Sequence, residues 1–325
     1  MPFNTGTGTQ CAIWKESSWG TAVTDTLLLN FLSETLDSEV IKTVEESLLA
    51  STAPPEFALM GMKASGDVSL ILKPENAGFL FKAALGGTDT VTQNSGGVTG
   101  QHQHSIVPTA AAGTQPSYTV YAYRKQATRR YSGMKVDVAA FEAAAGDYVR
   151  ATLTFKGKDE STGTAITTTS VPSKKSYKFV GATLSVGGTS YEFTKFRLEI
   201  RNNLEDGLQT SASGAYMTEP MHQRRNFVLT IDQPYGANDE TLRSTNFLTE
   251  TVVATVVLHM ESPELITGSS KFRADITLAN VAVLSQKTNV SGTGTIMTSI
   301  TCEATAVSTT SPCTAVVYDG TNSAY

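Results

Sequence analysis

The sequence predicts a mainly β protein built from two tandem β-sandwich or barrel domains, each with a flanking helix and a long loop between two strands. Apolar residues alternate with polar ones at the period of two that half-buried strands require. Helical periodicity is strong in one stretch only, and two segments far apart in the chain repeat one pattern at a constant offset. Together these three observations predict a duplicated β architecture.

The repeat preserves the spacing of charged and apolar positions. Its aligned pairs are Ile41 and Ile200, Lys42 and Arg201, Glu46 and Glu205, Leu49 and Leu208, Ala53 and Ala212, Met62 and Met221, and the alternating Val68, Leu70 and Leu72 with Phe227, Leu229 and Ile231. The two copies share no nucleophile, ligand set or acid/base pair, which favours a building block over an enzyme. Chance matching is the alternative, because 40% of positions are apolar.

The chain is long enough for two domains, each with a substantial core. It has 325 residues, and domains usually have roughly 100 to 200. The segment Lys158–Lys175 is rich in Ser, Thr and Gly, as connections between domains are. We therefore expect one domain over residues 1–170 and a second over residues 171–325.

Cysteines and hydropathy indicate a protein of a reducing cytoplasm. Cys11, Cys302 and Cys313 are odd in number and have no metal-ligand spacing. The segment Met1–Gln10 has neither the basic start nor the apolar core of a signal peptide. No apolar run reaches the roughly eighteen residues of a membrane helix, so we expect neither export by a signal peptide nor a membrane anchor.

Charge argues against a nucleic-acid-binding protein. The chain has 25 Lys plus Arg and 30 Asp plus Glu, a net charge of −5, whereas tight binding requires cations that neutralise phosphates. Two adjacent arginine pairs occur, Arg129-Arg130 and Arg224-Arg225. They are typical of solvated strand ends or ion pairs, and phosphate binding is the less favoured interpretation.

Several segments carry the strand pattern. Alternation is clearest around Val68–Leu72, Met134–Val138, Val149–Phe155 and Phe272–Leu278. Gly187-Gly188 predicts a tight hairpin, because glycine tolerates the positive φ angles of such turns. The apolar register then switches before Phe196, which predicts a β-bulge near Thr194 or Lys195.

Helices are expected after two of the strands. The first begins at Pro74 and ends before Gly86-Gly87, with one apolar stripe formed by Ala77, Leu80, Phe81, Ala84 and Leu85. A weaker start at Asn238, Asp239 and Glu240 follows the second copy of the strand pattern. The order of strand, long loop, strand and helix is thus predicted twice.

The two long loops, Ser47–Ser65 and Gly207–Gln223, are unusually apolar. Long loops are normally functional or disordered, and apolar content argues against disorder. Exposed methionines and aromatic residues need a cover, for which a second copy of the chain is the favoured candidate. Folding back on the loop's own domain is the alternative. The candidate intersubunit residues are Leu48, Leu49, Phe57, Leu59, Met60, Met62, Leu208, Tyr216, Met217 and Met221.

Motifs for chemistry are missing from the sequence. It has no phosphate-binding GxxxxGK[ST], no GxSxG elbow and no HExxH helix. His102-Gln103-His104 has no neighbouring carboxylate or cysteine to complete a metal site, so we expect solvated or hydrogen-bonded histidines. We predict no catalytic, cofactor-binding or metal-binding residue, and no enzymatic activity.

Several short motifs follow one another along the chain in a fixed order. They are Lys15-Glu16-Ser17-Ser18-Trp19-Gly20-Thr21-Ala22, the run Leu27–Leu36, Gly66-Asp67-Val68, Ala84-Leu85-Gly86, Tyr131-Ser132-Gly133-Met134-Lys135-Val136, Phe179-Val180-Gly181-Ala182 and Ile200-Arg201-Asn202-Asn203-Leu204. Taken in this order, they resemble the motifs of phage tail tube proteins, also called major tail proteins, of the larger two-domain kind. The resemblance covers nearly the whole chain. It implies sandwich or barrel domains whose sheets join around an axis and whose long loop reaches neighbouring subunits.

The resemblance implies a structural protein of the virion tail, assembled in the host cytoplasm from stacked rings. A duplicated chain closes a pseudo-sixfold ring from three copies, and a ring of six chains is the alternative. The implied partners are other copies of the chain, the tape measure, tail terminator and tail-tip proteins, and double-stranded DNA in transit without tight binding. The rival functions are the inner tube of a sheathed injection device and a β-sandwich capsid decoration or adhesion module.

A DNA conduit requires a lining that does not hold DNA. Because the duplex has a negative charge roughly every 1.7 Å, a basic lining would retain it. Strand residues that alternate with core positions are candidates for a neutral or acidic lumen surface. They are Asp67, Ser69, Thr230 and Asp232, followed by Glu39 and Glu199. Ordinary solvated strand faces on the outside of the particle are the alternative.

Overall fold

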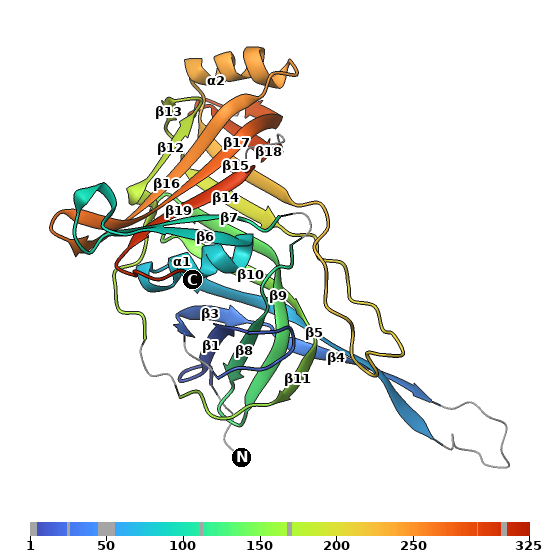
Figure 1. Cartoon of the computed structure of the whole chain (residues 1–325). Coiled ribbons are helices and arrows are strands. Elements are labelled where there is room, and N and C mark those ends of the chain that lie inside the picture. The colour runs from blue at the N-terminus through green and yellow to red at the C-terminus, as the bar shows by residue number, and fades with distance from the viewer. Residues whose placement is uncertain are drawn as a thin grey trace.

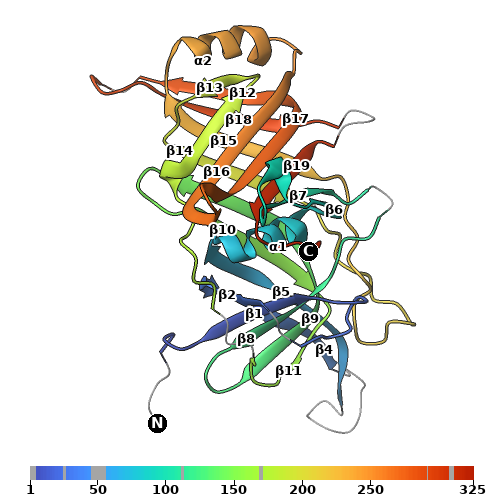
Figure 2. The same cartoon turned by 60° about the vertical axis from the view of Figure 1, so that its left-hand side comes forward.

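The computed structural model describes residues 5–24, 27–44, 56–110, 113–167, 171–290, 292–306 and 311–325. Over these ranges the chain is mainly β, as predicted, with nineteen strands and two α-helices in one extended, unclosed sheet system (Figure 1). Figure 2 shows a lower group of strands near the N-terminus and an upper group covered by the second helix.

The first part of the chain contains eleven strands and one α-helix among its described residues. Its elements are β1 (Gln10–Lys15), β2 (Leu27–Leu29), β3 (Phe31–Glu34), β4 (Asp37–Val44), β5 (Phe57–Ile71), α1 (Pro74–Leu85), β6 (Gly86–Thr92), the 3₁₀ turn Ser95–Gly97, β7 (His102–Pro108), β8 (Tyr118–Tyr123), β9 (Thr128–Ala144), β10 (Arg150–Gly157) and β11 (Asp159–Thr162).

The second part repeats the order of strand, long loop, strand and helix. It contains the 3₁₀ turn Phe179–Gly181, β12 (Ala182–Val186), β13 (Thr189–Tyr191), β14 (Lys195–Arg201), β15 (Asn226–Pro234), α2 (Ala237–Leu242) with a π-helical continuation over Arg243–Phe247, β16 (Val253–Thr267), β17 (Ser270–Asn289), β18 (Met297–Ala304) and β19 (Cys313–Asp319). The order β14, β15, α2 thus matches the order β4, β5, α1.

Strand β9 is shared between two sheets. Its first residues pair with β8 and β11 in a sheet ordered β2, β1, β8, β9, β11. Its later residues pair with β10 on one side and β14 on the other. The strands β5, β10, β9, β14, β15 and β18 therefore form one antiparallel layer across the middle of the molecule.

Strand β17 carries the sheet into a second layer. Its later residues pair with β18, whereas its earlier residues pair with β16 and β19. The register shifts between Val283 and Ser285, and such irregularities bend a strand. Strand β19 pairs with β7, and β7 with β6, so the last strand of the chain lies beside strands of its first half.

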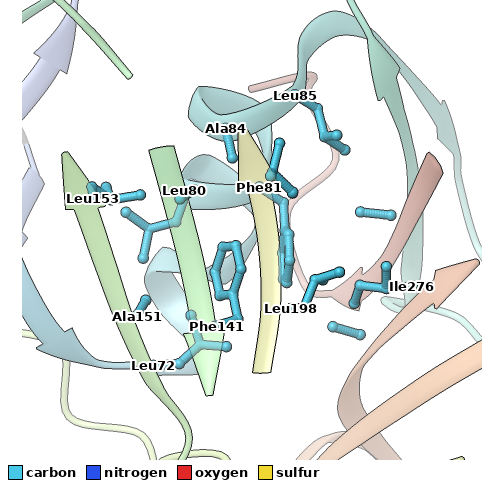
Figure 3. Packing of buried hydrophobic residues seen from close by; sticks show 14 of the residues in the cluster. Leu72, Leu80, Phe81, Ala84, Leu85, Phe141, Ala151, Leu153, Leu198 and Ile276 are labelled. Carbon is cyan, nitrogen blue, oxygen red and sulfur yellow. The ribbon is translucent and has the colours of Figure 1, made fainter. Parts of the chain in front are cut away.

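Helix α1 fills the space between the two layers. Leu80 and Phe81 point toward residues of the β5 to β18 layer, and Ile276 of β17 closes the cluster from the other layer (Figure 3). The rings of Phe81 and Phe141 stack with centroids 4.4 Å apart. Nearly every residue of α1 is buried, so the apolar stripe predicted from the sequence is only one part of its contact surface.

The ends of α1 are those that the sequence predicts. Pro74 begins the helix, and the Asn76 side-chain oxygen accepts a hydrogen bond from the Lys73 N–H at 3.1 Å. Gly86 ends the helix at φ 76°, in the left-handed region that glycine adopts without strain.

A buried carboxylate organises the segment that contains Glu16 and Trp19. Glu16 accepts hydrogen bonds from Ser117 Oγ at 2.7 Å, from Thr119 Oγ1 at 2.9 Å, and from the backbone N–H groups of Gly20 at 2.8 Å and Gly133 at 2.9 Å. The Trp19 indole N–H donates to the carbonyl oxygen of Gly133 at 3.0 Å. Two motifs that lie far apart in the sequence therefore meet around one side chain.

The hairpin at Gly187-Gly188 is confirmed, with both glycines at positive φ between β12 and β13. The bulge predicted near Thr194 or Lys195 is wrong. Strand β13 ends at Tyr191, and β14 begins at Lys195 with different partners, β9 and β15. The register switches because the chain passes from one group of strands to another.

We expect Phe81→Ala to lower the free energy of unfolding by about 3–5 kcal/mol, because the lost ring leaves a cavity between two layers. Leu248→Ala is the control, since Leu248 is exposed, and should change stability by less than about 0.5 kcal/mol. Urea unfolding of the monomer followed by circular dichroism measures both. Equal losses for the two variants would contradict the central role of α1.

Candidate functional site

The β4–β5 hairpin extends away from the body of the molecule (Figure 1) and exposes apolar side chains on both strands. Phe57 at its outer part is 70% exposed. Soluble monomers rarely leave such side chains together in water. The exposed apolar residues of the hairpin are Val40, Ile41, Val44, Phe57, Leu59 and Met60.

Part of the first predicted loop is a strand. Phe57, Leu59, Met60 and Met62 lie on β5, paired with β4, and not in an irregular segment. Alternation did not reveal this strand because apolar residues occur on both of its faces. Leu48 and Leu49 lie outside the described residues.

The second predicted loop lies directly beside the first. Gly207–Gln223, described over its whole length, contains no strand of three or more residues. The Met62 N–H donates to the carbonyl oxygen of Ala215 at 2.8 Å, and Met62 and Tyr216 form a parallel bridge. Leu208, Tyr216 and Met221 are exposed, whereas Met62 and Met217 are half-buried. The candidate residues of both halves thus meet at one place, which we call the composite arm: β4, residues 57–63 and residues 207–223.

The four candidate lumen residues share one face of the β5 to β18 layer. Residues directly opposite each other in an antiparallel pair project to the same face. Ser69 lies opposite Thr152 on β10. When the pairing is followed from Thr152 across β9 to β14, it reaches a residue of β14 two positions from Arg197 and therefore on the same face. Arg197 in turn lies opposite Thr230 on β15. Asp67 and Asp232 lie two residues from Ser69 and Thr230, so they project to this face as well. We call this surface the flat face.

Both arginines of β14 on the flat face are paired with carboxylates. Arg197 donates to Glu142 at 2.6 Å and to Glu199 at 2.7 Å, and Arg201 Nε donates to Glu199 at 2.8 Å. Burial opposes ionisation of the Glu199 carboxyl, but hydrogen bonds from both arginines outweigh it and lower the pKa of Glu199. The charges of Arg197 and Arg201 on the flat face are therefore fixed in ion pairs. Glu199 lies here, whereas Glu39 lies on the hairpin beside Lys63, at 3.1 Å.

A comparison with protein-family models matches residues 6–304 to the family described as phage tail tube protein. The chain belongs to the phage tail tube protein family. The match covers both the composite arm and the flat face. A comparison with curated proteins found no match.

Membership makes the chain a structural component of the bacteriophage tail and not an enzyme, as the sequence predicts. Tail tube proteins assemble with copies of themselves and with other tail proteins, and their location is the virion tail, built in the host cytoplasm. None of the helices in the described residues has the length and hydrophobicity that a membrane span requires.

The histidine motif of this tail tube family member lies in its interior. His104 is fully buried, and its Nδ1 donates to Asp89 at 3.0 Å and its Nε2 to the carbonyl oxygen of Thr321 at 2.9 Å. Asp319 lies 3.3 Å from Nε2. Since all of these partners are acceptors, both ring nitrogens carry protons. Sequence reasoning expected hydrogen-bonded histidines but missed the two carboxylates, which come from β6 and β19.

The His104 cluster binds the last residues of the chain to the first half. Tyr325 donates its N–H to Asp89 at 2.9 Å and its hydroxyl to Asp319, and its ring lies 4.7 Å from the His104 ring. Burial opposes protonation of the imidazole, but Asp319 and Asp89 outweigh it and raise the pKa of His104 to about 10. Within the described ranges, no group of three or more His, Cys, Asp or Glu side chains is arranged to hold a metal ion.

The cysteines of this tail tube family member are free and buried. Burial is the main cause that raises the pKa of each thiol to about 12. A thiol is a nucleophile only as the thiolate. In the folded chain we therefore expect no nucleophilic reactivity from Cys11, Cys302 or Cys313.

We expect His104→Ala to lower the free energy of unfolding by about 3–5 kcal/mol, because two buried carboxylates lose their cation. His259→Ala is the matched control, since His259 pairs with Asp275 in a partly exposed position, and should cost less than about 1 kcal/mol. Chemical unfolding at neutral pH measures both. If His104→Ala lowered the free energy of unfolding by no more than the control does, the stabilising role of the His104 cluster would be contradicted.

The pH dependence of stability has a defined direction. The pKa of His104 is raised from 6.5 to about 10 on folding, so its contribution is complete below pH 6.5 and is lost as the pH rises toward 10. We expect wild type to lose stability relative to His104→Gln over that window. A constant difference between the two would show that His104 does not titrate there.

Proposed function

We propose that this chain polymerises as stacked rings into a hollow tail tube through which double-stranded DNA passes during ejection. The observation that carries the proposal is the composite arm, which exposes apolar side chains from both halves of the chain in one projecting element. Burying such apolar surface between two chains contributes roughly 25 cal/mol per Å² to the free energy of association. A second copy of the chain is the cover that membership in a self-assembling family supports.

Three chains per ring are favoured in this proposal, with six as the alternative. Strand, loop, strand and helix occur twice in one chain, which supports two wall units, residues 1–170 and residues 171–325. The pairing of β9 with β14 joins these units into a continuous layer. One chain would thus supply two neighbouring segments of the ring, and the tape measure, tail terminator and tail-tip proteins would contact the ends of the tube.

We assign the flat face to the lumen of the tube. Its arginines Arg197 and Arg201 are held by Glu142 and Glu199, so these two cations are not free to bind phosphates along the DNA. A protein that neutralises many phosphates releases many counterions and binds tightly. Paired charges and hydroxyl groups, such as the Ser69–Thr152 hydrogen bond of 2.9 Å, support passage without capture.

We expect Phe57→Ser, Leu59→Ser and Met60→Ser, combined in one variant, to abolish tubes while the monomer stays folded. The control is Leu248→Ser, which removes an equally apolar and exposed side chain from another part of the surface. Electron microscopy measures polymerisation, circular dichroism measures folding, and native mass spectrometry gives the number of chains per ring. Normal tubes from the triple variant would refute the role of the arm.

We expect purified protein to bind duplex DNA too weakly to measure at physiological salt. Asp67→Lys with Asp232→Lys should slow genome delivery more than tube assembly, because two new cations per chain would hold phosphates repeatedly along the tube. Glu240→Lys is the control, a carboxylate on the exposed surface of α2. The lumen assignment fails if the wild-type protein binds DNA tightly with strong salt dependence, or if both variants deliver DNA equally well.

A further inference from the structure

The outer part of β5 has an open edge that the main layer does not cover. Strand β10 pairs with β5 only as far as Gly157 opposite Ala64. Beyond that point one edge of β5 pairs with β4, while the opposite edge presents the N–H and C=O groups of alternate residues within 57–63. Such open edges recruit other strands and lead to uncontrolled pairing.

The loop from the second half covers the inner part of this edge. Ala215 accepts a hydrogen bond from the Met62 N–H at 2.8 Å, and the Gln209 side-chain amide donates to the carbonyl oxygen of Met60. A Cβ added at Gly61 would lie 3.4 Å from the Gln209 side-chain oxygen, so the loop lies directly against the hairpin. The two contacts satisfy successive polar groups of β5.

The loop is also fixed at its base, on strands other than those of the hairpin. Glu219 pairs at 2.7 Å with Lys135, which is almost completely buried and also donates to the carbonyl oxygen of Pro220 at 2.8 Å. Asp206 pairs with Lys156 at 2.8 Å. Since Lys135 and Lys156 belong to β9 and β10, the loop begins and ends on the rigid layer.

We propose that the Gly207–Gln223 loop is an edge cap and brace that fixes the direction of the β4–β5 hairpin, so that both halves of the chain present one docking surface to a second copy. The identity of the occupant rests on the proposed function, whereas the brace itself is a property of the single chain. Residues 57–59 lie beyond the cap and remain available for contact. Holding an element in its bound orientation raises affinity, because less freedom is lost on binding.

Hydrogen exchange of the monomer tests the brace without assembly. We expect Gln209→Ala to speed exchange of the amides of residues 57–63 several-fold and to slow polymerisation. Gln223→Ala is the matched control on the same loop, since its side chain is exposed, and should leave both unchanged. Unchanged exchange in Gln209→Ala would overturn the brace even if tubes form normally. Changed exchange in the variant, together with a wild-type protein that never forms tubes, would leave the brace standing while refuting the proposed function.

A reversible crosslink distinguishes a brace within one chain from exchange of loops between chains. Met62→Cys with Tyr216→Cys joins the two bridge partners, and the buried native thiols, with pKa values raised to about 12, do not compete. We expect the oxidised variant to polymerise at least as fast as the reduced one. Polymerisation that requires reduction would show that the loop leaves β5 during assembly and would overturn the proposal.

Discussion

The burial of α1 between two β layers is the constraint on which the rest of the molecule depends. The layer from β5 to β18 and the layer around β17 and β19 contain strands from both halves of the chain, and their buried apolar residues form one cluster with those of α1. Phe81 lies against Phe141 on one side, and Ile276 approaches from the other. The helix therefore makes one body out of two copies of a strand and helix pattern, and it fixes the plane of the flat face.

Two buried charged groups then tie the outlying segments to this body. Glu16 gathers four donors from the segment around β1, β8 and β9, and His104 lies between carboxylates of β6 and β19. An unpaired charge in such surroundings would be strongly unfavourable. The buried hydrogen bonds and ion pairs of Glu16 and His104 consequently hold each segment in one place.

The surfaces assigned to assembly and to DNA passage are chemically different because they arise from different parts of the strands. The flat face belongs to strands whose other side is buried, so its polar residues alternate with core residues and their charges are matched across neighbouring strands. The hairpin of the composite arm extends past the end of β10, and it carries exposed apolar residues on both of its strands. One long strand, β5, contributes to both surfaces.

The sequence by itself determined the β class, the two helices, the turn at Gly187-Gly188 and the family, because alternation, capping residues and motif order are local properties of the chain. It also placed Asp67, Ser69, Thr230 and Asp232 on solvent-facing sides of their strands. The tertiary structure decided which segments that are distant in the sequence lie next to each other. It showed that Phe57 and Met60 belong to a hairpin strand, that the two long segments meet, and that His104 has two carboxylate partners. These facts depend on pairings between residues far apart in the sequence, such as Met62 with Tyr216 and His104 with Asp319, and no local pattern records which distant segment will cover an exposed edge or neutralise a buried charge.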